Sequence, residues 1–390
     1  MNVPEELKDF RNFVYIVWEH LGLPEPTPVQ YDIAHYLQHG ERRQIVLAYR
    51  GVGKSYLTSA YVVWSLLLNP ALNILVVSAS KTRADDFSTF TQRLINEMPI
   101  LKHLKARPDQ RDSKIAFDVA PAPAAHAPSV KSVGITGQIT GSRADIVVAD
   151  DVESLGNSET QGMRDKLGNL VKEFDSVLKP DGEIKYLGTY QTEMSLYKVL
   201  PERGYIPRVW TGRYPEEKKI ATYGDSLAPF ILNSLTKDPS LENQPVDPKR
   251  FDEDDLVERE LSYGRSGFAL QFMLDPSLSD ADRYPLKLKD FIVMDIDIEK
   301  APEKVIHSSS PEKILKDLPS VGFSGDYFHM PQAIDGDWIP YRGTVMTIDP
   351  SGRGQDETGY CIMSMLNGYL YVHECSGVDG GYTKETLTKI

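Results

Sequence analysis

The sequence has few cysteines, no long apolar run and no secretory start, and each absence excludes a class of protein. Only two cysteines, Cys361 and Cys375, occur in 390 residues, which argues against a disulfide-rich secreted scaffold and a cysteine-based metal cluster. No apolar run reaches the roughly 18 residues needed to span a bilayer. The acidic start MNVPEELKDF lacks the basic and apolar regions of a secretory signal. We therefore expect a cytoplasmic protein with reduced thiols and no membrane partner.

The chain also lacks an excess of positive charge. Lysine and arginine number 43 against 56 aspartates and glutamates, which gives a formal net charge of −13. Such a balance argues against a protein that coats nucleic acid statically. It does not exclude a motor that grips DNA transiently through a local basic face. The length of 390 residues favours two or three domains.

The stretch IVLAYRGVGKSYL, residues 45–57, has the order of a strand, a glycine-containing turn and a helix. Glycines let backbone N–H groups surround phosphate oxygens, and the lysine and hydroxyl that follow can reach the β- and γ-phosphates and Mg²⁺. Ala48 stands where the usual motif has its first glycine, which is acceptable if φ stays negative. We interpret this stretch as a variant phosphate-binding loop; the alternative is a chance Gly-Lys-Ser in a surface turn. The expected nucleotide-binding residues are Arg50, Gly51, Val52, Gly53, Lys54 and Ser55, and Ser55 is also an expected Mg²⁺ ligand.

Polar residues at two other places in the sequence also fit a nucleotide-binding ATPase. Gln30 follows a proline-fixed turn at the start of a helix, where a glutamine in many nucleic-acid-dependent ATPases reads the adenine edge. The alternative is that Gln30 is an ordinary solvent-exposed side chain at the start of a helix. A strand expected to end at Ser78 is followed by Ser80 and Lys81, which lie at the carboxyl end of a parallel strand. These three residues either contact DNA phosphates or only begin a capped helix.

The stretch SRADIVVADDVES, residues 142–154, supplies the other half of a nucleotide site. A buried strand ends in Asp150 and Asp151. An aspartate at such a strand tip can hold Mg²⁺, and a second carboxylate can polarise the attacking water. We expect Asp150 to be the metal residue and Asp151 the catalytic carboxylate, with Glu153 as the second choice.

Two arginines and one further strand end complete the expected ATPase site. Arg143 precedes the acidic strand and can reach a γ-phosphate in its own or in a neighbouring subunit, and Arg50 is the competing arginine finger. The stretch IKYLGTYQTE, residues 184–193, ends a strand in polar residues that can sense the γ-phosphate and transmit hydrolysis to a moving part. The expected coupling residues are Gly188, Thr189 and Gln191.

The last part of the chain changes character. Residues 343–377 contain three strand patterns in succession, and Asn367-Gly368 is the two-residue hairpin signal. Asp349 ends the first strand, as the first carboxylate of an RNase H-like nuclease would. Two-metal cleavage needs several carboxylates, and the spacing of Glu374 and Asp356 does not show that they complete such a site.

Taken together, several stretches resemble the large terminase subunit of T7-like short-tailed phages. The resemblance implies an α/β fold: a RecA-like P-loop ATPase of the additional-strand, conserved-Glu type, with a parallel sheet and helices on both faces. A small lid or linker subdomain and the beginning of an RNase H-like domain would follow, with domains at 1–200, 201–340 and 341–390. The stretches that carry the resemblance are LAYRGVGKS, TGQITGSRADIVVADDVE, YLGTYQTEM, GFALQFMLDPSLSDADRYPL and IDPSGRGQDETGY.

The resemblance also implies a function. It is that of an ATP- and Mg²⁺-dependent motor, a homo-oligomeric ring of five subunits in the bacterial host cytoplasm, docked on the portal of a procapsid. Its partners are double-stranded DNA and the small terminase subunit. It threads DNA inward, and its nuclease cuts concatemers with Mg²⁺ or Mn²⁺, Asp349 being the first nuclease carboxylate and metal ligand. The sequence stops before the family's later nuclease carboxylates, so we expect this chain to hydrolyse ATP without cutting DNA alone.

Three other interpretations were weighed against the motor. A superfamily-two-like helicase or translocase shares the glutamine, the phosphate loop and the Asp-Asp strand end, but residues 200–390 show no second RecA-like half. A nucleotide-gated scaffold would need a damaged hydrolytic end, whereas Lys54, Ser55, Asp150 and Asp151 are intact. A small-molecule kinase would need a lid for a second substrate, and nothing in the sequence resembles one.

Overall fold

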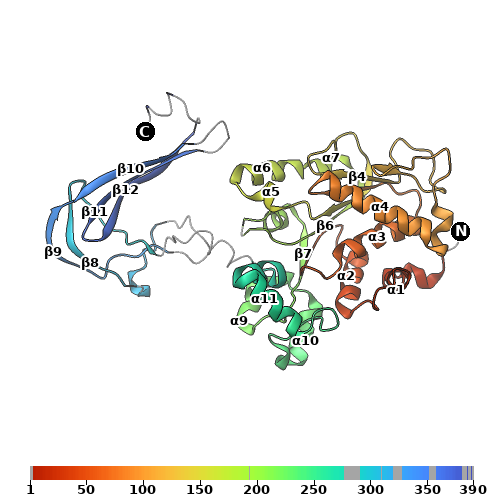
Figure 1. Cartoon of the computed structure of the whole chain (residues 1–390), viewed down its shortest axis with the longest axis horizontal. Coiled ribbons are helices and arrows are strands. Elements are labelled where there is room, and N and C mark those ends of the chain that lie inside the picture. The colour runs from red at the N-terminus through yellow and green to blue at the C-terminus, as the bar shows by residue number, and fades with distance from the viewer. Residues whose placement is uncertain are drawn as a thin grey trace. The chain divides into compact units, whose positions relative to one another are not determined.

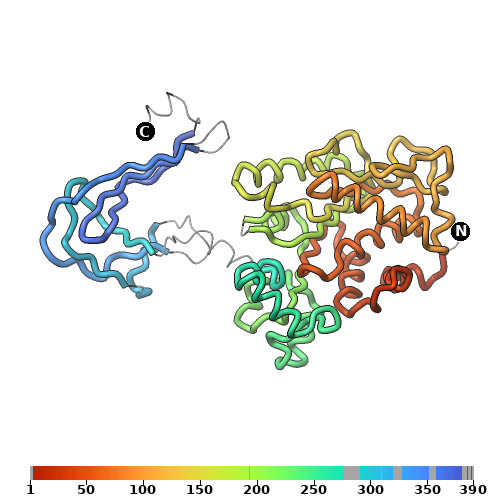
Figure 2. Tube along the Cα trace, viewed as in Figure 1, coloured from red at the N-terminus to blue at the C-terminus, as the bar shows by residue number. Residues whose placement is uncertain are grey.

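The chain forms two compact units, 1–282 and 283–390, each of which is described by itself (Figures 1 and 2). The computed structural model describes residues 3–192, 194–275, 290–308, 310–318, 327–350 and 357–379, with Lys384 and Thr388. By contacts, residues 201–275 belong to the first unit, because an edge strand of its sheet and several partners of the phosphate loop lie there. The three-part functional division at 200 and 340 stays a prediction.

The first unit is built on a seven-stranded sheet with the order β3-β4-β2-β5-β6-β1-β7. All neighbours are parallel except β3 and β4, which are antiparallel. The expected parallel sheet is therefore corrected at one edge, since no helix between β3 and β4 carries the chain across for a parallel pair. The strands are β1 (Arg43–Ala48), β2 (Ile74–Ser78), β3 (Ala116–Phe117), β4 (Val130–Gly134), β5 (Ala144–Asp150), β6 (Leu178–Gly188) and β7 (Ile206–Trp210).

The order of the strands places the two halves of the expected site at one edge. β6 lies between β1, which leads into the phosphate loop, and β5, which ends at Asp150. This is the additional-strand arrangement that the resemblance implies. Because β1, β5 and β6 are parallel, their carboxyl ends meet at the same edge of the sheet, where ligands bind in such folds.

The helices of this unit follow from apolar periodicity and from caps. In α3, which begins directly after the phosphate loop, the residues from Leu57 to Leu67 are buried. Thr27 and Gln30 form a capping box at the start of α2. Among the described residues, no helix has both the length and the apolarity to cross a membrane. The helices are α1 (Phe10–His20), α2 (Pro28–His39), α3 (Lys54–Leu68), α4 (Lys81–Glu97), α5 (Leu155–Ser158), α6 (Gln161–Leu170), α7 (Glu173–Val177), α8 (Leu196–Val199), α9 (Glu217–Tyr223), α10 (Pro229–Lys237) and α11 (Glu253–Phe268).

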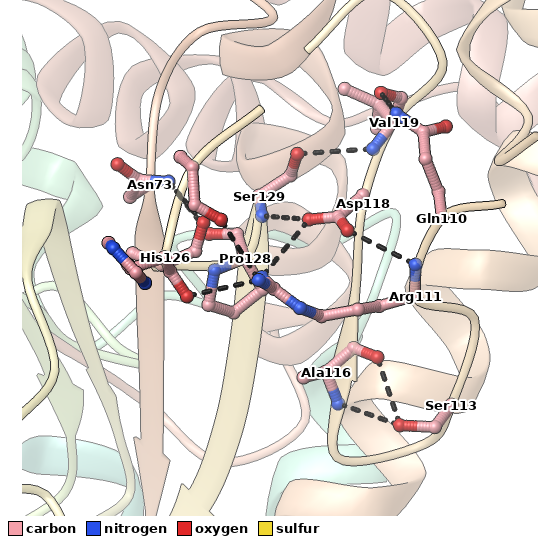
Figure 3. A network of polar contacts seen from close by, with 12 residues as sticks. Asn73, Gln110, Arg111, Ser113, Ala116, Asp118, Val119, His126, Pro128 and Ser129 are labelled. Atoms are coloured by element: carbon pink, nitrogen blue, oxygen red, sulfur yellow. Dashed lines mark hydrogen bonds and ion pairs between the residues drawn. The ribbon is translucent and has the colours of Figure 1, made fainter. Parts of the chain in front are cut away.

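A network of hydrogen bonds holds the irregular segment that precedes β4 (Figure 3). The Asp118 carboxylate accepts hydrogen bonds from the backbone N–H groups of Arg111 and Ser129, both at 3.1 Å. The Arg111 guanidinium donates to the carbonyls of Ala125 and His126 at 2.9 and 3.0 Å. Asn73 donates to Pro128 at 2.9 Å. These bonds lie where β2 and β4 begin, at the edge opposite the expected nucleotide site, so we assign the network a structural role.

The second unit contains two antiparallel sheets: β8 (Lys300–Ile306) with β9 (Ala333–Pro340), and β10 (Gly343–Asp349) with β11 (Thr358–Leu366) and β12 (Tyr369–Val378). The hairpin predicted between the last two strands is confirmed. Asn367 and Gly368 have φ values of 50° and 84°, as the two central residues of a type I′ turn require. A small core of Ala301, Val305, Leu366 and Tyr371 joins the sheets.

Candidate nucleotide-binding site

The phosphate loop has the strand, turn and helix that the sequence predicts. β1 is buried between β6 and β7, and α3 begins at Lys54. Gly51 and Gly53 adopt φ values of 90° and 98°, a region that strains any residue with a Cβ. The first position of the loop, Ala48, is not among the residues with positive φ, so the missing glycine costs the backbone nothing.

Lys54 lies at the centre of this loop. Its ammonium donates to the carbonyl of Ala48 at 2.5 Å and to that of Tyr49 at 3.3 Å. Burial lowers the pKa of Lys54, and the charges of Asp151 and Asp150 partly oppose that shift. The parallel order β5-β6-β1 brings the lysine and both aspartates to the same edge of the sheet, although about 100 residues separate them in the sequence. Ser55 follows Lys54 in the first turn of α3 and is exposed.

Asp150 and Asp151 are adjacent carboxylates at the end of β5. The pKa of Asp150 is raised to about 7, chiefly by burial and also by the charge of Asp151, and the charges of Lys54 and Arg83 partly oppose this shift. Asp151 has a φ of 47°, and its N–H donates to the carbonyl of Leu187 on β6 at 2.8 Å. Oxygen ligands are those that Mg²⁺ prefers, and a cation here would relieve the repulsion of the two carboxylates. The carboxylates are therefore of the kind that can hold a magnesium ion, and the assignment of Asp150 and Ser55 as its ligands stays a prediction.

Glu153 occupies a different environment. Its side chain is buried, and it accepts hydrogen bonds from Leu196 N at 2.6 Å, Ser195 Oγ at 3.0 Å and Gln191 N at 3.3 Å. Burial raises the pKa of Glu153 to about 7, although these three donors lower it. The carboxylate therefore joins the end of β5 to the segment after β6, which is the segment expected to couple hydrolysis to motion.

The coupling residues lie around this carboxylate. Gln191 donates its backbone N–H to Glu153 and its side-chain amide to Thr189 Oγ1 at 3.4 Å. Thr189 is buried. Gly188 lies so close to Tyr197 that an added Cβ would overlap both Cζ and the hydroxyl oxygen of the tyrosine.

We expect Gly188→Ala to destabilise the first unit by about 1–3 kcal/mol, because the methyl group must displace a buried tyrosine. ATP hydrolysis is expected to fall as well, since Tyr197 follows the two residues that hold Glu153. Urea unfolding and steady-state hydrolysis measure the two effects. Gly156→Ala is the matched control, because an added Cβ at Gly156 meets nothing within 4 Å. Equal stability of the two variants would contradict the overlap.

Gln30 is buried with its amide engaged by the protein. Its Oε1 accepts from the Thr27 N–H at 3.0 Å, and its Nε2 donates to the carbonyl of Val52 at 2.7 Å. The side chain thus contacts the phosphate loop itself. The sequence did not predict this contact with the loop. The role of Gln30 in reading the adenine edge stays a prediction.

The two candidate arginine fingers lie at opposite edges of the sheet. Arg50, in the phosphate loop, donates to Gln271 Oε1 at 3.3 Å. Arg143 directly precedes β5, whose seven residues end at Asp150; at about 3.3 Å per residue, roughly 20 Å separate the two ends. This distance exceeds the reach of an arginine side chain, so the option that Arg143 serves its own subunit is corrected. That Arg143 acts in a neighbouring subunit, or that Arg50 is the arginine finger instead, stays a prediction.

Arg83 was not identified from the sequence, yet it lies beside the expected catalytic carboxylate. Its guanidinium is 3.7 Å from Asp151 Oδ2. The sequence could have identified Arg83, because it lies in the first turn of α4, directly after β2, and β2 is the neighbour of β5 in the sheet.

The three residues considered for contact with DNA lie at the same end of β2. Ser80 caps α4 by accepting a hydrogen bond from Arg83 N at 3.3 Å, and Lys81 pairs with Asp85 at 2.5 Å. Ser78 is fully buried, so the suggestion that it contacts DNA is corrected.

Asp349 belongs to the second unit. It ends β10, pairs with Gly359 in the sheet register, and is exposed. Glu374 on β12 accepts a hydrogen bond from Tyr360, and Asp356 lies outside the described residues, as do residues 276–286 of the stretch GFALQFMLDPSLSDADRYPL. Within the described parts of the chain, no group of three or more His, Cys, Asp or Glu residues could hold a metal ion. The nuclease role of Asp349 stays a prediction.

Comparison with known proteins agrees with the motifs. The chain is 49% identical over 388 residues to the large terminase subunit of Enterobacteria phage T3, an alignment that covers 98% of this chain and 66% of that protein. The chain thus spans just under two thirds of that relative's length. The family described as "Terminase Bacteriophage T7, Ribonuclease H-like domain" matches residues 348–390.

Solved structures of low sequence identity also match. The large terminase ATPase domain of Thermus phage P74-26 is 14% identical, with a TM-score of 0.36, over 66% of this chain and 96% of that one. The large terminase of bacteriophage D6E in complex with ATP-gamma-S is 10% identical, with a TM-score of 0.35, over 93% and 72%. On the sequence identity to the T3 protein and the match of the nuclease-domain family, the chain belongs to the family of phage terminase large subunits.

Proposed function

We propose that this chain is an ATPase that drives double-stranded viral DNA into a procapsid. The observation that carries the proposal is that the parallel strands β1 and β5, on either side of β6, bring Lys54, Asp150 and Asp151 to one edge of the sheet. Lys54 and the loop N–H groups hold the phosphates, and Ser55 and Asp150 hold Mg²⁺. Mg²⁺, when bound, neutralises charge on the phosphates. Asp151 accepts a proton from the attacking water.

In this proposal the segment from Gly188 to Leu196 transmits hydrolysis. Glu153 bonds three donors of that segment, so a shift of the strand end that carries Asp150 and Asp151 also moves Gln191 and Ser195. Arg83 links Asp151 to the start of α4, the surface where Ser80 and Lys81 are candidates for contact with DNA phosphates. The motor acts as a ring, on a portal and with a small terminase subunit, because these are the partners that family membership implies.

A helicase-like translocase is the second candidate, since it shares the glutamine and the two halves of the site. Two assays on the wild-type chain separate them. We expect Mg²⁺-dependent ATP hydrolysis that double-stranded DNA stimulates, and displacement of a third strand from a triplex without separation of the duplex beneath it. ATP-dependent separation of a labelled duplex would favour the helicase, and absence of hydrolysis at every protein concentration would contradict both.

A further inference from the structure

A closed circuit of hydrogen bonds runs through the phosphate loop, and one of its members comes from far along the sequence. Asp247 Oδ2 accepts from Thr27 Oγ1 at 2.6 Å and from the Tyr49 hydroxyl at 3.0 Å. Thr27 N donates to Gln30, Gln30 donates to the Val52 carbonyl, and Val52 N donates to the Tyr49 carbonyl at 3.4 Å. The circuit therefore returns to Tyr49, and its five members are buried.

The backbone of Asp247 is itself held firmly. Its neighbour Val246 donates to the carbonyl of Gly212 at 3.0 Å, and the carbonyl of Asp247 accepts from the N–H groups of Arg250 and Phe251 at 3.0 and 2.9 Å. Arg250 Nε then donates to the carbonyl of Gly51 at 2.9 Å. The Phe251 ring lies where a side chain at Gly51 would stand, with 2.8 Å between its Cζ and an added Cβ. Residues 246–251 thus touch the phosphate loop at Tyr49 and at Gly51.

From this geometry we propose that Asp247 is a positioning residue of the nucleotide site, which fixes the arch from Tyr49 to Val52 against the start of α2. The inference rests on the function proposed above. Two hydroxyls converge on one buried carboxylate oxygen, and each belongs to an element that contacts the expected nucleotide. Tyr49 also presents its carbonyl to Lys54, so a displaced Tyr49 moves an acceptor of the phosphate-binding ammonium. Opening the circuit at any bond lets the arch shift.

The test uses the full chain and variants that each delete one hydroxyl. Tyr49→Phe and Thr27→Val are each expected to weaken binding of a fluorescent ATP analogue, and to raise KM for ATP, by about 5- to 10-fold, the value of one lost hydrogen bond. The turnover number kcat should change by less than about 3-fold, because the aspartates at the end of β5 are untouched. The double variant should bind about as weakly as either single variant, since one break already opens the circuit.

Two further variants separate positioning from general stability. Asp247→Asn keeps an oxygen that accepts both hydroxyls and should recover most of the affinity that Asp247→Ala loses. Tyr36→Phe is the matched control, because Tyr36 is also buried and its hydroxyl donates to the Ile206 carbonyl at 2.8 Å, at the other end of the sheet. We expect it to lower the urea midpoint without changing nucleotide affinity.

The outcomes are distinguishable. If Tyr49→Phe and Thr27→Val lower the urea midpoint as Tyr36→Phe does but leave the dissociation constant and KM at the wild-type values, the circuit is structural only and the inference is wrong. If the dissociation constant and KM of Tyr49→Phe and Thr27→Val rise while their urea midpoints stay near that of Tyr36→Phe, the inference is supported. If the wild-type chain itself binds neither ATP nor ADP, the proposed function fails, and the inference with it.

Discussion

Asp151→Asn is expected to lower kcat for ATP hydrolysis by about 10²- to 10⁴-fold, the usual contribution of a general base. ATP binding should stay close to the wild-type value. Asparagine removes the proton acceptor but tolerates the positive φ of 47° at this position, whereas alanine would add backbone strain. Single-turnover hydrolysis and binding of a fluorescent ATP analogue give the two quantities. Asp175→Asn, which removes an exposed carboxylate paired with Arg43, is the control and should hydrolyse ATP normally.

The contrast with Glu153→Gln identifies the catalytic carboxylate. Both oxygens of Glu153 already accept hydrogen bonds from the coupling segment. A glutamine amide must turn its NH₂ group toward one of those donors, which costs roughly 1–3 kcal/mol of stability. We expect this variant to unfold at lower urea concentration and to retain measurable chemistry. Loss of chemistry in Glu153→Gln together with normal hydrolysis in Asp151→Asn would reverse the assignment of the two carboxylates.

The parts of the site that local sequence encodes were predictable. A strand, a glycine turn and Lys54-Ser55 form one continuous segment, and an apolar run ending in Asp150-Asp151 forms another. Parallel alternation of strands and helices then places both at the carboxyl edge of a sheet. The Asn367-Gly368 turn was predictable for the same reason, because two successive positive φ values leave few residue choices.

The remaining features depend on contacts between distant segments. Thr27 and Asp247 are 220 residues apart in the sequence, and no periodicity or spacing connects them. The burial of Glu153 depends on the path of the chain after β6, so its pattern alone could not separate a catalytic carboxylate from a linking one. The position of Arg143, in contrast, could have been predicted from the sequence. Arg143 directly precedes β5, so it lies at the amino end of that strand, whereas the nucleotide is expected at the carboxyl end.

Arg143→Ala is expected to lower the ATPase rate of assembled subunits by about 10³-fold, the lower end of the range for an arginine finger. At the amino edge of β5, the exposed guanidinium cannot reach the nucleotide of its own chain. If a neighbouring subunit presents it, as we predict, the wild-type rate per subunit should climb with protein concentration. Arg93→Ala, which removes an exposed arginine paired with Glu97, is the control and should behave as the wild type does.

Mixing two inactive variants gives the decisive measurement. Lys54→Ala subunits lack a working phosphate loop but keep Arg143, whereas Arg143→Ala subunits keep the loop. In a mixed ring, an Arg143→Ala subunit next to a Lys54→Ala subunit regains both parts of one site, so activity should return on mixing. A rate per subunit that is flat with concentration, and unchanged by Arg143→Ala, would contradict the trans role. Arg50, already inside the phosphate loop and held by Gln271, would then be the arginine that acts on its own nucleotide.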